Sequence, residues 1–502
     1  MSTSKRFLAY VFTATIAFSF FATGELVAQQ PKYSGLPMPQ GYLAGPELNE
    51  NATKEQETEW KNKYGPAQKR LRDGTKKIRE VLASGGDVKS NPEARQFLEK
   101  VIFPAMTQTD EVTLSNLGAK RKKFLKDFLD KGVTGPARSN MIDFTIDTLK
   151  KYSIDSALHP SARLNAVILM SQLTERPLIS RVQAPLASGK AFVVLQKIFN
   201  GQNEKQFPEY LKIAAFSGMK NQLEMNSKAG QAIGANVKAP LVEAVMKILP
   251  VEVDPDKDAA AYWKKRQAVQ FAGLLKDAQT LPALLAILED DVSSFELKLD
   301  VVKAISQAGS MTGNSKSNGT VIAAISKFAA KTVDAEATII MAAREKMIRD
   351  GILFGNTDLE QKGITIDFEP RNEDGSGGRQ NQGSDTRKVP FIELPNYQLN
   401  ISRNRLRAVA IFSPQAMVST NRSGGLDGKA KTLATNIDQE LKSLLQRSQV
   451  GLVDLEVKVR GGELTPQQKD ELRKTSYVDQ MIKVCKDSAK ILNEQLDNYA
   501  AE

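Results

Sequence analysis

The residue types that most often carry catalysis or bind transition metals are scarce in this sequence. Its 502 residues contain one histidine, His159, and one cysteine, Cys485. These counts exclude H-E-x-x-H zinc sites, multi-histidine clusters and C-x-x-C pairs. His159 precedes Pro160 and is expected to be a loop or helix-capping residue rather than a general base. Cys485 is expected to be a small buried residue of the last helix, with a reactive or intermolecular thiol as the alternative.

Two further patterns match known motifs only in part, and a third motif is absent from the sequence. Residues 254–258 (DPDKD) begin like a calcium loop, but Ala259 replaces its glycine and Lys265 its bidentate glutamate. Residues 217–220 spell S-x-x-K without the S-D-N and K-T-G motifs that accompany it in β-lactamases. The sequence has no G-x-x-x-x-G-K-[ST] phosphate loop. We therefore predict no catalytic residue, no metal site and no cofactor, with a carboxylate-pair enzyme acting on glycans as the alternative.

A basic cluster near the C-terminus is the candidate binding site. Its members are Arg403, Arg405, Arg407, Arg422, Lys429 and Lys431. Arginines at alternate positions share one side of a β-strand but spread around an α-helix. A strand would therefore favour an anion-binding patch here. The alternative is a solvated segment beside a flexible linker.

The whole chain is basic, with a formal net charge of +11 at pH 7. A second basic stretch, residues 61–79, lies on the polar face of a predicted amphipathic helix that is broken at Gly74. Such charge favours anionic partners, namely acidic polysaccharide or a membrane surface, with nucleic acid the least favoured. Simple solvation of lysine-rich helix faces is the alternative interpretation.

The elements that must position these residues are helices with one apolar face. Residues 263–275, 281–291 and 295–305 form three such segments joined by short turns. Neighbouring helices of this kind are expected to pack antiparallel. Because none of them buries its apolar face alone, the pattern indicates helix-pair repeats that cover one another by stacking.

Similar segments precede and follow these three. First helices are expected at residues 160–173 and 210–216, and second helices at 191–199 and 241–249. Residues 320–328 should complete the fourth pair, and residues 335–348 should begin a fifth. If Ala166, Ala215, Ala268 and Val302 are equivalent positions, the spacings are 49, 53 and 34 residues, so the repeats are irregular.

The repeat region resembles the HEAT/armadillo class of α-solenoids. The resemblance rests on the first-helix pattern Pro160, Arg163, Ala166 and Met170 and on the apolar helix and acidic turn of residues 281–291. The chain departs from the pattern where Lys298 and Asp300 stand in place of the usual helix-start arginine. The class implies scaffolding along a concave face and has no common catalytic residues.

The other regions differ in composition from the repeats. Lys5 and Arg6 followed by the uncharged apolar run of residues 7–21 predict a secretory signal, with an uncleaved anchor as the alternative. Residues 369–388 cannot form a core and are expected to be disordered, with short strands beside them at 363–368 and 390–394. The predicted regions are a signal peptide (1–28), an extended linker (29–51), an N-terminal helical region (52–152), HEAT-like repeats (153–355), a low-complexity linker (356–400) and a C-terminal helical region (401–502).

Together these observations predict an all-α protein, an irregular HEAT-like helix-pair solenoid with helical ends. They favour an exported, non-enzymatic scaffold, periplasmic, cell-envelope or extracellular, that binds a protein partner along its helical surface. The alternative function is a basic cell-envelope protein that binds acidic glycan or an anionic membrane surface electrostatically.

Overall fold

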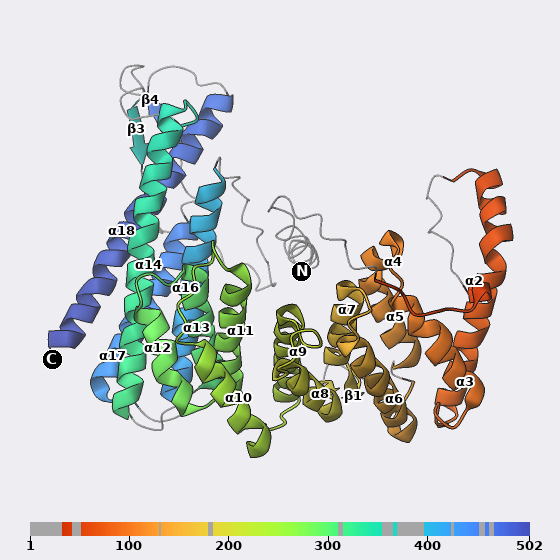
Figure 1. Ribbon diagram of the computed structural model, residues 1–502. Helices are drawn as coiled ribbons and strands as arrows, with labels where there is room; N and C mark the ends of the chain where they lie inside the picture. The colour runs from red at the N-terminus through yellow and green to blue at the C-terminus, as the bar shows by residue number, and fades with distance from the viewer. Residues whose placement is uncertain are drawn as a thin grey trace, which may run out of the picture. The chain divides into compact units, whose positions relative to one another are not determined.

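The structure is a computed structural model that describes most of the chain (Figure 1). The described ranges are 33–42, 52–129, 132–178, 184–309, 315–353, 365–368, 396–422, 426–450, 457–460 and 466–501. The predicted signal peptide and the segments 369–388 and 390–394 lie outside them. Helices account for most of the described residues, which confirms the all-α prediction. None of the helices described is both long enough and apolar enough to cross a bilayer.

The chain divides into two compact units. The first comprises Met1–Glu175 and Val193–Ala214, and the second comprises Arg176–Phe192 and Ala215–Glu502. The predicted boundary between residues 152 and 153 is not the one that separates these units. The helix of residues 160–171, expected to open the repeats, belongs to the first unit and packs on the helix before it.

The first unit is built from helices of very different lengths. They are η1 (Gln40–Tyr42), α2 (Lys54–Ala83), α3 (Pro92–Phe97), the π-helix Leu98–Ile102, the 3₁₀ helix Pro104–Met106, α4 (Glu111–Ser115), α5 (Leu117–Phe128), α6 (Gly135–Ile154) and α7 (Pro160–Ser171). The core contains buried Phe103, whose ring lies against those of Phe124, Phe144 and Tyr152. Buried aromatic rings of this kind contribute much of the apolar burial of a small core.

The segment 33–42, predicted as part of an extended linker, packs on the first unit. The Leu36 amide donates to Thr107 Oγ1 at 3.0 Å, and Gln108 Nε2 donates back to the Leu36 carbonyl at 2.8 Å. The Tyr42 ring lies edge-on to Phe97 with centroids 5.7 Å apart. These contacts hold the segment against the helices rather than leaving it as a free linker.

Helix α2 is long and continuous. Thr53 caps it in a capping box with Gln56, and the helix ends before the turn at Gly85, whose φ is +78°. The expected break at Gly74 is wrong. A Cβ at this position would lie 2.3 Å from the Phe97 ring, so the glycine permits close approach of α3 instead of ending the helix.

Two very short strands and two helices follow in the sequence. They are β1 (Thr174–Arg176), β2 (Leu186–Ala187), α8 (Gly189–Phe199) and α9 (Glu209–Lys228). The second unit continues with α10 (Ala235–Ile248), α11 (Ala259–Leu275), the 3₁₀ helix Ala278–Thr280, α12 (Leu281–Glu289), α13 (Phe295–Ala308), α14 (Ser315–Arg349), α16 (Tyr397–Arg422), α17 (Gly428–Val450) and α18 (Pro466–Ala501).

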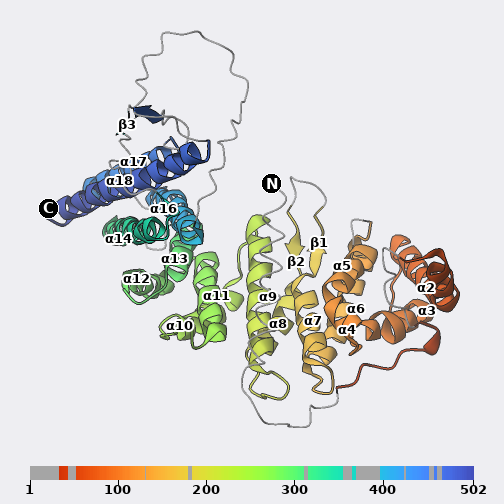
Figure 2. The same ribbon diagram turned by 90° about the horizontal axis from the view of Figure 1, so that it is seen from above.

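In the second unit, α11 lies beside α13, and α13 lies beside α16 (Figures 1 and 2). In both pairs, the residue numbers of contacting side chains increase together along the two helices. Tyr262 contacts Ser294 and Arg266 contacts Asp300 in the first pair. Arg405 contacts Glu296 and Ser419 contacts Ser306 in the second. The three helices therefore run in the same direction. Helix α12 follows α11 after a five-residue connection and packs on both α13 and α14.

Two predictions for the second unit need correction. Residues 320–328 and 335–348, expected as separate helices, belong to the single helix α14, because the intervening segment AAKTVD contains neither glycine nor proline. The strand expected at 363–368 is confirmed as β3 (Thr365–Phe368). Its antiparallel partner β4 (Val457–Arg460) lies in the region predicted to be helical, with Thr365 opposite Arg460 and Phe368 opposite Val457.

Candidate interaction surface

The basic cluster proposed from the sequence is divided by its local structure. Arg403, Arg405 and Arg407 lie on helix α16, so the strand alternative is wrong and the three side chains do not share one side. Arg407 is exposed, as are Lys429 and Lys431 on α17. Arg422 is the last residue of α16, and its side chain is not among those that the structure describes. The geometric argument for an anion-binding patch at this position therefore fails.

Arg405 forms ion pairs with acids from two other helices. Its Nη2 lies 3.2 Å from Glu296 Oε1 on α13, and its Nη1 lies 3.3 Å from Glu336 Oε1 on α14. The guanidinium carbon also lies 5.1 Å from the centre of the Phe295 ring. The Glu336 side chain is 3% exposed and that of Arg405 is 27% exposed. Arg405 therefore compensates a buried carboxylate and joins three helices.

A second ion pair joins α11 to α13. Arg266 Nε donates to Asp300 Oδ2 at 2.6 Å, and the Asp300 side chain is 5% exposed. Burial disfavours the charge of Arg266, but its hydrogen bond to Asp300 leaves the pKa of the guanidinium raised. Nearby, Gly273 lets the helices approach closely, because a Cβ there would lie 2.7 Å from the Ala304 Cα.

About one turn after Asp300 on α13, Lys303 reaches α16. Its Nζ lies 4.4 Å from the centre of the Phe412 ring, a cation–π contact, and burial lowers the pKa of the ammonium. The contacts described so far connect half-buried aromatic and basic side chains across α11, α13 and α16. We call this set the aromatic–basic row: Tyr262, Arg266, Phe295, Lys303, Arg405 and Phe412.

The sequence contained a signal for one of these pairs. Arg266 and Asp300 are 34 residues apart, the same spacing as the equivalent positions Ala268 and Val302. Asp300 departs from the repeat pattern in sequence, and the structure places it opposite the arginine of the preceding helix. Opposite charges at equivalent positions of adjacent repeats predict such a pair. No comparable signal linked Arg405 to Glu296, 109 residues away.

The residue that most resembled a catalytic candidate has a structural role. His159 is the N-cap of α7, and its Nδ1 accepts the Ser161 N–H at 3.1 Å. The Tyr33 ring lies edge-on to the imidazole, and burial lowers the pKa of His159. Beside it, the guanidinium of buried Arg163 donates to the main-chain carbonyl of Ser153 at 3.0 Å.

The other candidate motifs are also accounted for by packing and capping. Cys485 is 1% exposed on α18, and burial raises the pKa of its thiol to about 12. Asp258 caps α11 by accepting the Ala261 amide, while Asp254 pairs with Lys257. Lys220, from the S-x-x-K match, lies on α9 and donates to Gln270 at 2.6 Å. Among the described residues, no cluster of His, Cys, Asp and Glu is arranged to hold a metal ion.

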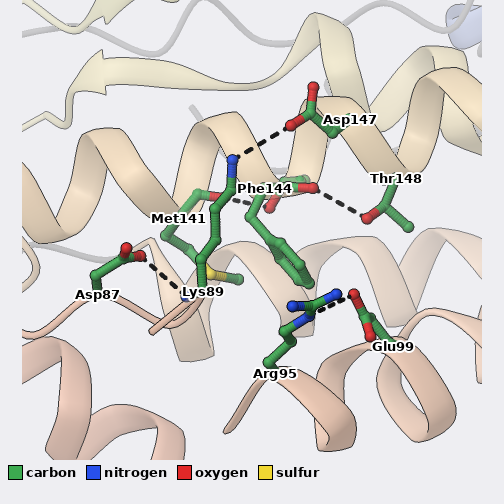
Figure 3. A network of polar contacts seen from close by, with 9 residues as sticks. Asp87, Lys89, Arg95, Glu99, Met141, Phe144, Asp147 and Thr148 are labelled. Carbon is green, nitrogen blue, oxygen red and sulfur yellow. Dashed lines mark hydrogen bonds and ion pairs between the residues drawn. The ribbon is translucent and has the colours of Figure 1, made fainter. Parts of the chain in front are cut away.

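The first unit contains a polar network at the end of α2 (Figure 3). Lys89 pairs with Asp147 of α6 at 3.3 Å while its amide donates to Asp87, and Arg95 pairs with Glu99. The ion-pair side chains are largely exposed, and exposed pairs each contribute about 0–1 kcal/mol. This network fixes the loop after α2 on α6 and presents no reactive group.

Comparison of the chain with family models, with curated proteins and with solved structures finds no match.

Proposed function

We propose that this chain is an exported, non-catalytic interaction module whose second unit is built as an irregular HEAT-like solenoid. The support is that α11, α13 and α16 run in the same direction and that α12 connects α11 to α13 in the sequence. In helix-pair repeats the equivalent helices run in one direction and form one layer of the stack. The resemblance of residues 281–291 to the second helix and acidic turn of a HEAT repeat supports the same architecture.

The partner is proposed to be a protein that binds over the aromatic–basic row. The observation that carries this proposal is the gathering of half-buried Tyr, Phe, Arg and Lys side chains over three neighbouring helices. Aromatic residues and arginine are enriched at the energetic centres of protein interfaces, because they bury large areas and retain polar groups. The row extends across separate helices, as a scaffold surface requires.

A photo-crosslinking amino acid at position 412 tests this proposal in the full chain. We expect one defined protein from the native compartment to be captured from position 412 and not from position 418, whose valine is 45% exposed on the same helix. Lys303→Gln should reduce retention of that protein at least tenfold, whereas Lys331→Gln, on α14, should not. Equal capture from both positions, or retention that Lys303→Gln leaves intact, would contradict the proposal. The proposal would also be contradicted if the purified chain cleaved a polymer and a single Asp or Glu substitution abolished this activity.

A further inference from the structure

Among the described residues of the first unit, the surplus of basic side chains is confined to two helices. Helix α2 carries nine Lys and Arg residues against five acids, and α5 carries five against one, so their combined charge is +8. The other described residues of this unit carry ten basic and eleven acidic side chains, a charge of −1. The unit therefore has one strongly basic region on an otherwise balanced surface.

The cations of α2 form two rows. A helix turns about 100° per residue, so six of the nine fall within roughly 80° of one another. These six, the outer row, are Lys54, Lys61, Lys69, Arg72, Lys76 and Arg79, and each is exposed. They lie on the side of the helix away from buried Ile78 and Leu82. At 1.5 Å per residue the outer row is about 38 Å long.

The remaining cations of α2 mostly hold the helix in place. Arg70 donates to the Gly41 carbonyl at 3.5 Å, and Lys77 pairs with Glu93 of α3. Lys63 lies 5.3 Å from the centre of the Tyr64 ring. Because these residues repeat every seven positions, they occupy a face different from that of the outer row.

In the outer row, Lys61 and Lys76 form exposed ion pairs with Glu57 and Glu80 of the same helix. Exposed pairs of this kind contribute little and do not prevent a partner from binding. For Lys54, Lys69 and Arg72 no ion pair to another described residue is found.

Helix α5 extends the same basic region. Arg79, at the end of the outer row, pairs with Asp127 of α5, which brings the two helices together. Lys120 and Arg121 turn inward and bond to the Ala105 carbonyl and to Asn165. Three further lysines lie on α5, and no ion pair to another described residue is found for them: Lys122, Lys123 and Lys126.

An aromatic pair lies at the beginning of the basic helix. Trp60 and Tyr64 are half-buried on α2, with ring centroids 5.7 Å apart. The second half of the same apolar face is covered by the unit, as buried Ile78 and Leu82 show. Trp and Tyr beside Lys and Arg are typical of surfaces that meet the headgroup region of a bilayer.

We propose that the outer row of α2 and these three lysines of α5 form a docking surface for an anionic phospholipid bilayer, with Trp60 and Tyr64 at its edge. A bilayer presents negative charge over a plane, and cations spread along about 38 Å of helix can contact it together. The uncharged apolar run of residues 7–21 lies upstream in the same chain and is of the kind that directs a chain to a membrane. This surface belongs to the first unit, so it is independent of the aromatic–basic row.

Vesicle binding tests the proposal, with the fluorescence of Trp60 as reporter. The chain has two tryptophans, so Trp263→Phe leaves Trp60 as the sole indole. We expect this variant of the mature-length chain to bind vesicles of 30% phosphatidylglycerol in phosphatidylcholine with a blue shift of its emission. Binding to pure phosphatidylcholine should be absent, and 0.5 M salt should release the protein.

Neutralising part of the outer row should weaken this binding. In the Trp263→Phe background, Lys69→Gln, Arg72→Gln and Lys76→Gln together should reduce the partition coefficient about a hundredfold, since each cation near an anionic surface contributes roughly fivefold. The control Lys247→Gln, Lys257→Gln and Lys490→Gln removes the same charge from side chains that are 73%, 85% and 79% exposed in the second unit. Circular dichroism verifies that both variants are folded.

Three outcomes would overturn the proposal. The first is equal vesicle binding by the two triple variants, because net charge alone would then explain it. The second is absence of binding to the anionic vesicles. The third is preference for a soluble acidic polysaccharide over the vesicles, with the same loss in the outer-row variant, which would assign the surface to a glycan instead.

Discussion

Two basic regions of this chain look alike in sequence and differ in what their charges contact. Helix α16 carries four arginines and no acid, while α2 carries nine cations interspersed with five acids. Judged only by the absence of acids among its own residues, α16 is the better site for an anion. Yet Arg405 of α16 is neutralised by Glu296 and Glu336 from other helices, whereas the outer row of α2 is exposed. Local charge density is therefore a poor guide to surface charge when helices pack through ion pairs.

The physical reason for this difference is the geometry of burial. Arg405 lies where α13, α14 and α16 meet, and a charge in such a position requires an acid partner. The outer row of α2 lies away from the apolar face, and every side chain in it is exposed, so water can solvate these charges whether or not they form ion pairs. Side chains of one type thus serve stability in one region and are available for binding in the other.

Removing Arg405 should give the largest loss of stability. Arg405→Ala leaves the carboxylate of buried Glu336 without its cation, and loss of one partner of a buried pair costs about 3 kcal/mol or more. Urea unfolding followed by circular dichroism measures this change. Arg407→Ala on the same helix removes an exposed arginine and should change stability by less than about 0.5 kcal/mol. Equal effects of the two substitutions would contradict the distinction drawn between buried and exposed arginines.

Replacing a glycine by alanine should change stability in opposite directions in the two units. Gly273→Ala places a methyl group 2.7 Å from the Ala304 Cα, so it should destabilise the second unit by about 1–3 kcal/mol. Gly118→Ala in α5 meets only the end of the flexible Arg121 side chain, at 3.7 Å, and should stabilise the first unit by about 0.4–1 kcal/mol. Thermal unfolding of the two variants checks both signs. A stable Gly273→Ala protein would show that α11 and α13 do not approach as closely as described.

The smallest effect concerns His159 and pH. Burial lowers its pKa in the folded state, so the unfolded state binds the proton more readily. The contribution of neutral His159 to the free energy of unfolding is therefore fully present above the unfolded pKa of about 6.5, and it is lost as the pH falls below that value. His159→Asn keeps a capping side chain that does not titrate, so the wild type should lose stability relative to this variant between pH 8 and pH 5. A free-energy difference that stays constant over this range would refute the burial of the imidazole.

Some features of the fold could be predicted because they depend on neighbours in the chain. The helices predicted at residues 263–275, 281–291 and 295–305 follow from apolar spacing near 3.6 residues and from caps and turns within a few positions, and the structure has a helix at each place. The capping role of His159 follows from its place before Pro160. The single helix α14 was not predicted because its apolar residues form two separate patterns, although no residue between them interrupts a helix.

The sequence by itself determined that the chain is helical, which segments contain most of its helices, and that it carries a surplus of positive charge. Backbone geometry and amphipathic spacing act over a few residues, so these features can be read locally. Tertiary structure alone decided which cations are neutralised, how β3 pairs with β4, and that α2 keeps its outer row exposed. These outcomes depend on partners far away in the chain, such as Glu336 and Glu296 at 69 and 109 residues from Arg405. Only packing of the helices brings such residues within a few ångströms of each other.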